Sequence, residues 1–384
     1  MFDPPDRVPF SSISPSVIHC DRHRKAAFQA AVRGTVLLVN RRHTLPLGPK
    51  VNNVLVTGPL AGSTEVMLGN YYGLSPDLRS LLEGVTEYAP EGVRMDFRQG
   101  CLLARPRPNP SDWAAFEAAK ADTVIFALGC SPQLEGEEGD AVESFTKGDR
   151  DRIELPKEQL DYFKEIVAAV RKKKSATRLV VVLFGGSALA VPEIAEQADA
   201  VLWAGYPGEA GGSALGAILW GKESPGGRLP ITFPRRTSVL PSFADYGMKG
   251  RTYRFMKARD VLFPFGYGLG YSSCQWRQAA LRVVGSSLEF SIQLRNSGNR
   301  AEEEVVQVYR QDSRGPRLVA FQRVRLKQGE TRRVVLRVPK NRWFEFDGKG
   351  IEIPWSGKQS FLISAHAPWT KKRYGFSLSI RLRA

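Results

Sequence analysis

Two kinds of apolar pattern follow one another along the chain, and the change between them constrains the fold more than any other feature. In residues 50–230, apolar residues form short continuous runs separated by helical stretches. The runs cover 54–57, 123–128, 179–184 and 200–204. Continuous runs are typical of strands that are covered on both faces. We therefore predict an α/β domain with a mostly parallel sheet sandwiched by helices.

Two of the helical stretches can be described from their spacing. In residues 157–170 apolar side chains recur at helical intervals and form one stripe, made of Leu160, Phe163, Ile166, Val167 and Val170. A second helix is predicted to open at Ser111, which we interpret as an N-cap residue with Asp112 in the first turn. Its expected apolar positions are Trp113, Phe116 and Ala119.

From about residue 277 the apolar residues alternate with polar ones instead. Phe290, Ile292 and Leu294 show this period, and a turn signal follows at 296–299. Roughly 100 residues of short strands predict an all-β sandwich, and the lack of a Cys–Trp–Cys spacing favours a fibronectin type III-like one. We divide the chain into an N-terminal lead-in (1–49), the α/β domain (50–235), a connector rich in Gly, Pro and aromatic residues (236–276) and the β-sandwich (277–384).

Charge is concentrated in the last of these segments. The chain of 384 residues carries a net charge of +16, and residues 277–384 hold 22 Lys and Arg against 9 Asp and Glu, a net charge of +13. A basic domain suggests nucleic-acid binding. However, the charges alternate with apolar residues, as in 332–337, and this indicates the solvated face of a sheet. We therefore predict no nucleic-acid partner.

Several other classes of protein are disfavoured. No apolar run approaches the ~20 residues that cross a bilayer, and residues 1–10 lack the apolar segment of a signal peptide, so we expect no membrane span and leave the compartment open. The four cysteines are scattered and are predicted to be free thiols, mostly buried. Without a phosphate-binding glycine loop, a G-x-S-x-G elbow or clustered His, we expect no cofactor, no metal and no hydrolase triad.

An acidic loop over residues 134–150 is the strongest local candidate for chemistry. It follows the predicted strand at 123–128, and ligands of open α/β sheets bind at the carboxyl ends of strands. Its acids within 135–143 are Glu135, Glu137, Glu138, Asp140 and Glu143. A carboxylic acid there could act as a general acid if burial or a neighbouring carboxylate raised its pKa. A solvated acidic loop is the alternative, and local composition by itself favours it.

The order of motifs resembles the C-terminal part of glycoside hydrolase family 3, the family of β-glucosidases and β-xylosidases. The resemblance covers nearly the whole chain. The matching segments are FDPP at 2–5, LLVN at 37–40, LPL at 45–47, VTGP at 56–59, LGNYYG at 68–73, GCSPQLEGEE at 129–138, GDRDRIELP at 148–156, YPGEAGG at 206–212, PGGRLPITFP at 225–234, GRTYRF at 250–255, LFPFGYGLGYS at 262–272, NSGNRAEEEVVQVY at 296–309 and FQRVRLKQGETRRV at 321–334.

The resemblance implies a glycosidase whose pocket lies between the α/β sandwich and a preceding (β/α)₈ barrel. In that family the barrel supplies the nucleophilic Asp and the sandwich supplies the general acid/base. The E-x-E pattern of the family falls on Glu135 and Glu137. It assigns the acid/base role to Glu135, with Glu137 and Glu138 as alternatives, because the loop length before Gly148 varies in the family. Residues 1–49 correspond to the lead-in from the barrel, so no nucleophile is expected in this chain.

Retaining hydrolysis needs two carboxyl groups about 5–5.5 Å apart, one as nucleophile and one as acid/base. We therefore expect the chain alone to be inactive and to act on a β-linked xylo- or gluco-saccharide only with a partner, either a separate barrel chain or another copy of itself. The alternatives are a non-catalytic carbohydrate- or partner-binding module and a degenerate remnant. Members of the family are often periplasmic or secreted, but no localisation is predicted here.

Overall fold

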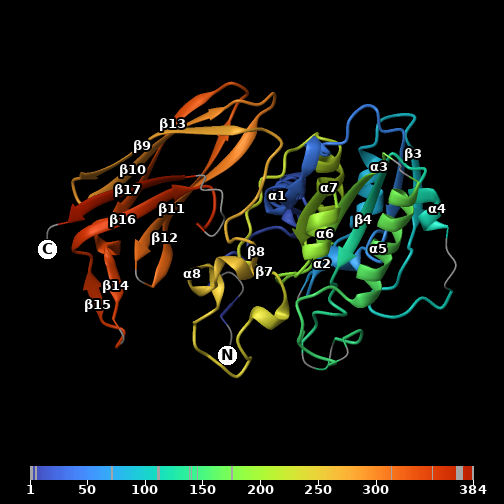
Figure 1. Ribbon diagram of the computed structural model, residues 1–384, viewed down its shortest axis with the longest axis horizontal. Coiled ribbons are helices and arrows are strands. Elements are labelled where there is room, and N and C mark those ends of the chain that lie inside the picture. The colour runs from blue at the N-terminus through green and yellow to red at the C-terminus, as the bar shows by residue number, and fades with distance from the viewer. Residues whose placement is uncertain are drawn as a thin grey trace.

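A computed structural model shows an α/β domain and an all-β domain side by side, with the connector between them (Figure 1). The structure describes residues 3–4, 7–70, 72–109, 113–137, 139, 141–144, 146–173, 176–312, 314–347, 349–368 and 375–382. Within these residues no helix is both long enough and apolar enough to span a membrane.

The α/β domain is built on a six-stranded sheet with the order β1-β6-β5-β4-β2-β3. Its strands are β1 (Val36–Asn40), β2 (Asn53–Thr57), β3 (Arg94–Arg98), β4 (Thr123–Gly129), β5 (Arg178–Phe184) and β6 (Ala200–Gly205). All neighbouring pairs are parallel except β1 with β6, which is antiparallel. Every residue of β4 and β6 is buried, as continuous apolar runs require. The predicted mostly parallel sheet is confirmed.

Helices cover both faces of this sheet. They are α1 (Asp21–Gly34), α2 (Glu65–Leu68), α3 (Leu81–Glu87), α4 (Ala114–Ala118), α5 (Lys157–Lys172), α6 (Pro192–Gln197) and α7 (Gly211–Leu219). One core cluster joins the sheet to α4, α5 and α6, and the other joins it to α1, α2, α3 and α7. The apolar stripe predicted for α5 faces the first cluster, where Phe163, Ile166, Val167 and Val170 are buried.

Two local expectations differ from the structure. Residues 1–49 were set apart as a lead-in, but they take part in the α/β domain. They contribute β1, which pairs with β6, and α1, which packs on α7. The α4 helix begins at Ala114, while Ser111 and Asp112 lie outside the described residues. Of its three expected apolar positions, Ala119 is buried, but Trp113 and Phe116 are 68% and 47% exposed, so the prediction was wrong for the two rings. The small side chains of Ala114 and Ala118 are buried in the core instead, where α4 packs on α5.

Glycines let α3 and α7 approach each other closely. A Cβ atom added to Gly84 of α3 would lie 1.8 Å from the carbonyl oxygen of Gly212. One added to Gly216 of α7 would lie 1.9 Å from the carbonyl oxygen of Gly84. Real Cβ atoms do not come this near to backbone, so the two helices would have to move apart to accept any larger residue.

We expect Gly84→Ala to lower the free energy of unfolding by about 2–3 kcal/mol, because an overpacked contact forces the backbone to shift. Gly62→Ala is the matched control, since no atom lies within 4 Å of the added Cβ, and it should change stability by less than about 0.5 kcal/mol. Denaturant unfolding of both variants measures the difference. Equal stabilities would show that the contact between the helices is not tight.

The all-β domain consists of two antiparallel sheets with orders β13-β10-β9 and β12-β11-β16-β17. The strands are β9 (Cys274–Val284), β10 (Ser287–Asn296), β11 (Glu302–Asp312), β12 (Gly315–Leu326), β13 (Thr331–Pro339), β16 (Gly357–Ser364) and β17 (Gly375–Leu382), and a small hairpin adds β14 (Phe344–Phe346) and β15 (Glu352–Pro354). Alternate residues such as Phe290, Ile292 and Leu294 share one core between the sheets. The predicted β-sandwich is confirmed.

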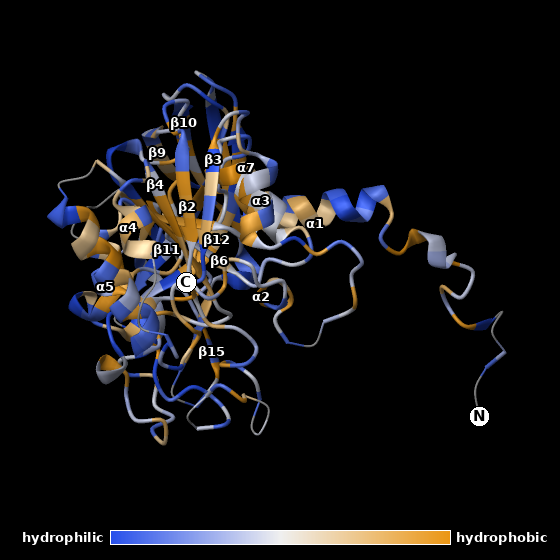
Figure 2. Cartoon of the chain, turned by 90° about the vertical axis from the view of Figure 1, so that its right-hand side faces the viewer, coloured by the Kyte–Doolittle hydropathy of each residue, from blue (hydrophilic) through white to orange (hydrophobic). Residues whose placement is uncertain are grey.

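The connector contains the short helix α8 (Thr252–Phe255) and β8 (Val261–Phe263), which pairs with β7 (Phe233–Pro234) at the end of the α/β segment. Some of its rings pack against the β-sandwich: Tyr253 stacks on Phe265 with 4.5 Å between ring centres and meets Tyr309 of β11 edge-on. Two other rings, Phe243 and Tyr246, are 91% and 88% exposed. Figure 2 shows that the segment before α1 runs away from the body of the molecule.

Candidate active site

The acidic loop begins where β4 ends, at the carboxyl edge of the sheet. Gln159 of α5 fixes this point, because its side chain accepts a hydrogen bond from the backbone N–H of Gly129 and donates one to the carbonyl of Gly129, both at 2.8 Å. The backbone N–H groups of Leu134 and Glu135 then both donate to the carbonyl of Ser131 at 2.9 Å, which makes a compact turn. The position of Glu135 is therefore set by the sheet.

The Glu135 side chain turns into the domain and is only 10% exposed. Its Oε1 accepts hydrogen bonds from Ser187 Oγ at 2.5 Å and from Arg150 Nη1 at 2.8 Å. Its Oε2 accepts from Tyr206 Oη at 2.5 Å and from the backbone N–H of Gly186 at 2.8 Å. Four donors from the ends of β5 and β6 and from the loop thus occupy the carboxylate.

These contacts determine the charge of Glu135. Burial by itself raises the pKa of Glu135, because it penalises the charged form. The hydrogen bonds from Ser187, Tyr206 and Gly186, together with the charge of Arg150, outweigh burial and bring the pKa below its usual range. Glu135 is therefore ionised at neutral pH, and both of its oxygens are already engaged. A general acid must instead be protonated before it reacts, with an oxygen free to reach the substrate.

Glu137 lies two residues further on and is exposed. It lines a hollow of about 460 Å³ whose other lining residues are Glu65, Asn70, Tyr72, Pro132, Gln133, Gly136 and Val142. The walls are held in place, because Asn70 Nδ2 donates to the backbone carbonyl of Glu135 at 2.9 Å and Gln133 Nε2 donates to Glu65 Oε2 at 3.0 Å. The hollow therefore combines a solvent-facing carboxylate with amide and phenol groups that can bind sugar hydroxyls.

The remaining acids of the loop do not join these two. Glu143 forms an ion pair with Arg105 at 2.8 Å. Glu138, which was an alternative acid/base candidate, and Asp140 lie outside the described residues. The interpretation as a solvated acidic loop describes Glu137 and not Glu135.

Sequence reasoning missed three of the groups around Glu135: Gly186, Ser187 and Tyr206. Their position directly after the predicted runs at 179–184 and 200–204 was the usable signal, because parallel strands all end at one edge of the sheet.

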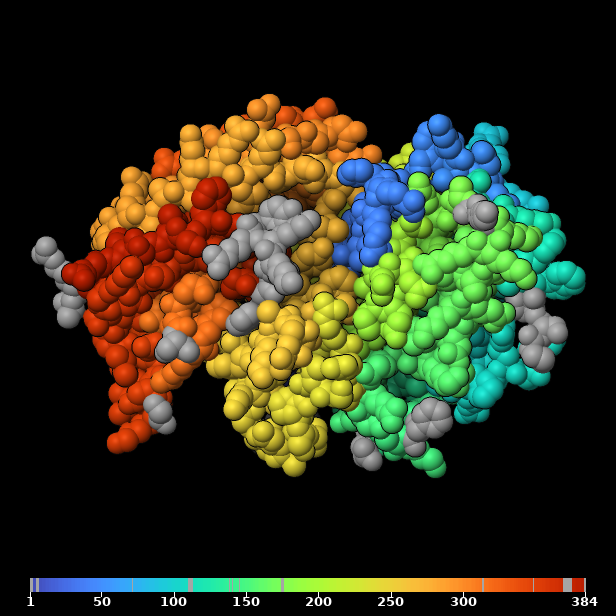
Figure 3. Space-filling view, in the orientation of Figure 1, coloured from blue at the N-terminus to red at the C-terminus, as the bar shows by residue number. Residues whose placement is uncertain are grey.

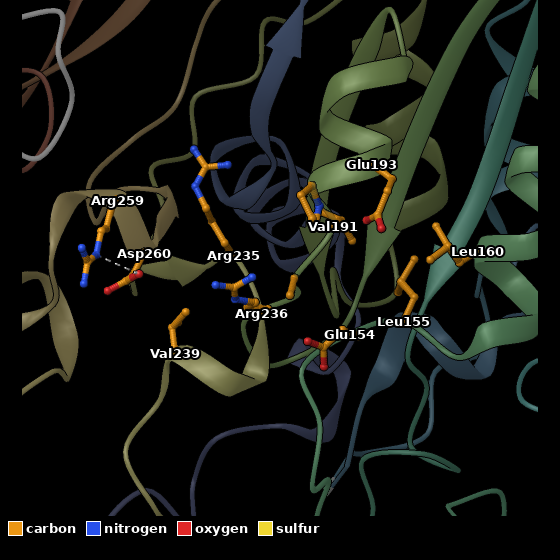
Figure 4. A pocket seen from close by; sticks show the side chains of 12 residues that line it. Glu154, Leu155, Leu160, Val191, Glu193, Arg235, Arg236, Val239, Arg259 and Asp260 are labelled. Carbon is orange, nitrogen blue, oxygen red and sulfur yellow. Dashed lines mark ion pairs between the residues drawn. The ribbon is translucent and has the colours of Figure 1, made fainter.

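A second hollow, of about 440 Å³, lies where the α/β domain meets the connector (Figure 4). Its Glu154 accepts hydrogen bonds from the backbone N–H and the Oγ1 of Thr237, at 2.7 and 2.5 Å. Figure 4 shows Arg235 pointing away from Glu154. The carboxylate of Glu154 is thus a structural acceptor that ties the connector to the domain, and it offers no free acid. In the described residues, no three His, Cys, Asp or Glu side chains are grouped to hold a metal ion.

The chain is thus a two-domain protein in which an α/β sandwich with glutamates on a loop at the carboxyl edge of its sheet is followed by a β-sandwich. The family model described as the glycosyl hydrolase family 3 C-terminal domain matches residues 35–271. The chain belongs to glycosyl hydrolase family 3, and the resemblance found in its motifs is confirmed.

The chain is similar to proteins named as xylosidases and glucosidases. It is 39% identical over 225 residues to a xylan 1,4-beta-xylosidase from Xylanibacter ruminicola, covering 56% of this chain and 25% of that protein. A beta-xylosidase from Formosa agariphila is 30% identical over 338 residues, covering 82% of this chain and 44% of that protein. A solved β-glucosidase from Erythrobacter marinus is 28% identical with a TM-score of 0.77, covering 94% of this chain and 51% of that one. The chain thus spans between a quarter and about half the length of these relatives.

Proposed function

We propose that this chain is the part of a β-xylosidase or β-glucosidase that supplies the general acid/base, and that a (β/α)₈ barrel supplies the nucleophile. The observation that carries the proposal is the hollow at the carboxyl edge of the sheet, where Glu137 faces solvent beside a carboxylate that is fixed from four sides. The family membership and the relatives named as xylosidases and glucosidases support the reaction class.

The contacts favour Glu137 over Glu135 as the acid/base. Glu135 anchors the loop: its carboxylate holds the loop to Gly186, Ser187 and Tyr206, and so it positions the residue two places further on. In the reaction Glu137 would donate its proton to the glycosidic oxygen as that bond breaks. It would then take a proton from the water that attacks the glycosyl-enzyme intermediate. A barrel that covers the hollow would remove water from around Glu137 and the glycosidic oxygen, so that proton transfer takes place out of contact with solvent.

The substrate class is a saccharide with a terminal β-linked xylose or glucose. The polar side chains of the hollow would bind the part of the substrate beyond the cleaved bond, because Asn70, Tyr72 and Gln133 flank the proposed proton donor. The choice between xyloside and glucoside would belong to the barrel, which in this family binds the sugar on the other side of that bond.

The partner surface would include the exposed rings of the connector. Exposed large apolar groups such as Phe243 and Tyr246 commonly mark interfaces. Glu137, at the carboxyl edge of the sheet, is exposed as well. A second copy of the chain is the alternative occupant of this surface.

The experiment is to mix the purified chain with a barrel domain from a related family member and to follow hydrolysis of aryl β-xyloside and aryl β-glucoside. Activity is expected in the mixture and in neither component alone, with a complex on gel filtration. Binding of xylo- or gluco-oligosaccharide by the chain without activity in the mixture would favour a carbohydrate-binding module instead. Activity of the chain alone would contradict the proposal.

A further inference from the structure

The outer face of the three-stranded sheet β13-β10-β9 carries two rows of side chains of the same geometry. The register places Arg282 and Arg337 on either side of Glu289, a row that we call the first rung. It places Arg277 and Arg333 on either side of Gln293, which we call the second rung. The rungs are four residues apart along β10, or roughly 13 Å. Figure 3 shows the gold and orange surface of these strands along the upper left rim, clear of the α/β domain.

The charges of the first rung are paired with one another. Glu289 Oε1 accepts from Arg282 Nε at 2.9 Å and Nη2 at 2.5 Å, and Oε2 accepts from Arg337 Nε at 3.2 Å and Nη2 at 3.1 Å. Each guanidinium group therefore donates two charge-assisted hydrogen bonds to one oxygen of Glu289, so both oxygens of this carboxylate are occupied.

The second rung has the same two arginines but lacks the anion. An uncharged Gln293 takes the central position, and Arg277 and Arg333 donate only to neutral groups, the side chains of Gln275 and Ser291. Both arginines are exposed, and neither forms an ion pair within the described part of the chain. Arg295, the next outward residue of β10, adds a third uncompensated charge.

Acidic side chains of this domain are used elsewhere and do not neutralise the second rung. Glu303 and Glu304 pair with Arg33 and Arg228 across the contact with the α/β domain. Asp312 and Glu345 pair with the buried Arg310. Arg277 and Arg333 lie on β9 and β13 with β10 between them, and no carboxylate of the described residues forms an ion pair with either guanidinium group.

We propose that the second rung binds carboxylate groups of an acidic polysaccharide, with the external carboxylate taking the place that Glu289 has in the first rung. The first rung shows which anion fits this spacing of guanidinium groups. The face also lacks aromatic residues: the row between the rungs is Ala280, Ser291 and Val335, so no ring is available to stack on a nucleic-acid base. This inference does not depend on the proposed glycosidase function.

The test measures binding of the full chain to polygalacturonate at low salt, with fully methyl-esterified polygalacturonate as the uncharged probe. We expect binding to the charged polymer alone, weakening steeply as salt is added. Arg277→Gln with Arg333→Gln should weaken it by roughly tenfold, since each exposed ion pair contributes up to about fivefold. The matched control, Arg24→Gln with Arg94→Gln, removes two exposed arginines that pair within the α/β domain and should bind nearly as the wild type does.

Gln293→Glu tests the geometry without removing an arginine. The new carboxylate should bind Arg277 and Arg333 as Glu289 binds its two arginines, raising the melting temperature while lowering affinity for polygalacturonate by at least fivefold. Unchanged affinity in Gln293→Glu, or equal losses in the arginine pair and its control, would overturn the proposal. Equal affinity for a DNA duplex would overturn the assignment to a carboxylate polysaccharide and leave a general polyanion surface.

Discussion

Replacing Glu137 by Gln is expected to lower kcat/KM of the barrel-complemented enzyme by about 10²–10⁴-fold on an unactivated xyloside or glucoside. The glycosidic oxygen of such a substrate leaves as a poor leaving group, and it depends on the proton that Glu137 would supply. Glutamine keeps the size and polarity of the side chain and cannot donate that proton. Steady-state kinetics of the two proteins give the ratio directly.

Substrates with different leaving groups distinguish a proton donor from a residue that only positions the loop. A dinitrophenyl glycoside leaves without protonation, so Glu137→Gln should form the glycosyl-enzyme at nearly the wild-type rate on that substrate. Glu135→Gln should lose a similar factor on both substrates, because it loosens the loop and does not remove the proton donor. Glu143→Gln, which breaks only the exposed ion pair with Arg105, is the control and should keep nearly full activity. The reverse pattern for Glu135 and Glu137 would return the acid/base role to Glu135.

Removing Arg150 is expected to destabilise the folded protein strongly. Arg150→Met should lower the free energy of unfolding by about 2–3 kcal/mol at pH 7, because the Glu135 carboxylate stays buried without its counter-charge. Breaking a buried ion pair costs about 3–5 kcal/mol. We expect a smaller loss here because the other three hydrogen-bond donors still stabilise the Glu135 carboxylate. The double variant with Glu135→Gln should lose less than the sum of the two single variants.

The effect of Arg150 should depend on pH in a defined direction. The folded state lowers the pKa of Glu135, so this group stabilises the fold fully above its unfolded pKa of about 4.3, and the contribution is lost as pH falls through the folded pKa. The stability difference between wild type and Arg150→Met should therefore be constant above about pH 6 and shrink below pH 4. A difference that stays the same at pH 3 would show that Arg150 acts by packing and not by charge.

The fold was predictable from the sequence because its signals are local and repeated. Continuous apolar runs such as 179–184 are typical of strands covered on both faces, and the change to a period of two marked the sandwich. The edge strand β1 was harder to assign. It pairs with a single neighbour, β6, and it stands outside the strand–helix alternation. The face of α4 was missed because periodicity ranks apolar side chains by hydrophobicity, whereas close packing on α5 selects the small Ala114 and Ala118.

The location of the acidic loop was predictable from the sequence, whereas the role of each acid in it was not. The acidic segment after 123–128 and its E-x-E pattern led to Glu135 and Glu137, and they do lie at the carboxyl edge of the sheet. Sequence alone could not tell which carboxylate points inward. That depends on Ser187 and Tyr206, which are 52 and 71 residues away and reach Glu135 only because β4, β5 and β6 end together.

The central claim is that this chain contributes the acid/base and that the nucleophile comes from the barrel. Trapping the glycosyl-enzyme intermediate with a 2-deoxy-2-fluoro glycoside in the mixture of chain and barrel, followed by mass spectrometry of both, tests it most directly. We predict that the sugar is attached to the barrel and that this chain keeps its unmodified mass. A sugar attached to this chain, for example at Glu65, which also lines the hollow, would contradict the account.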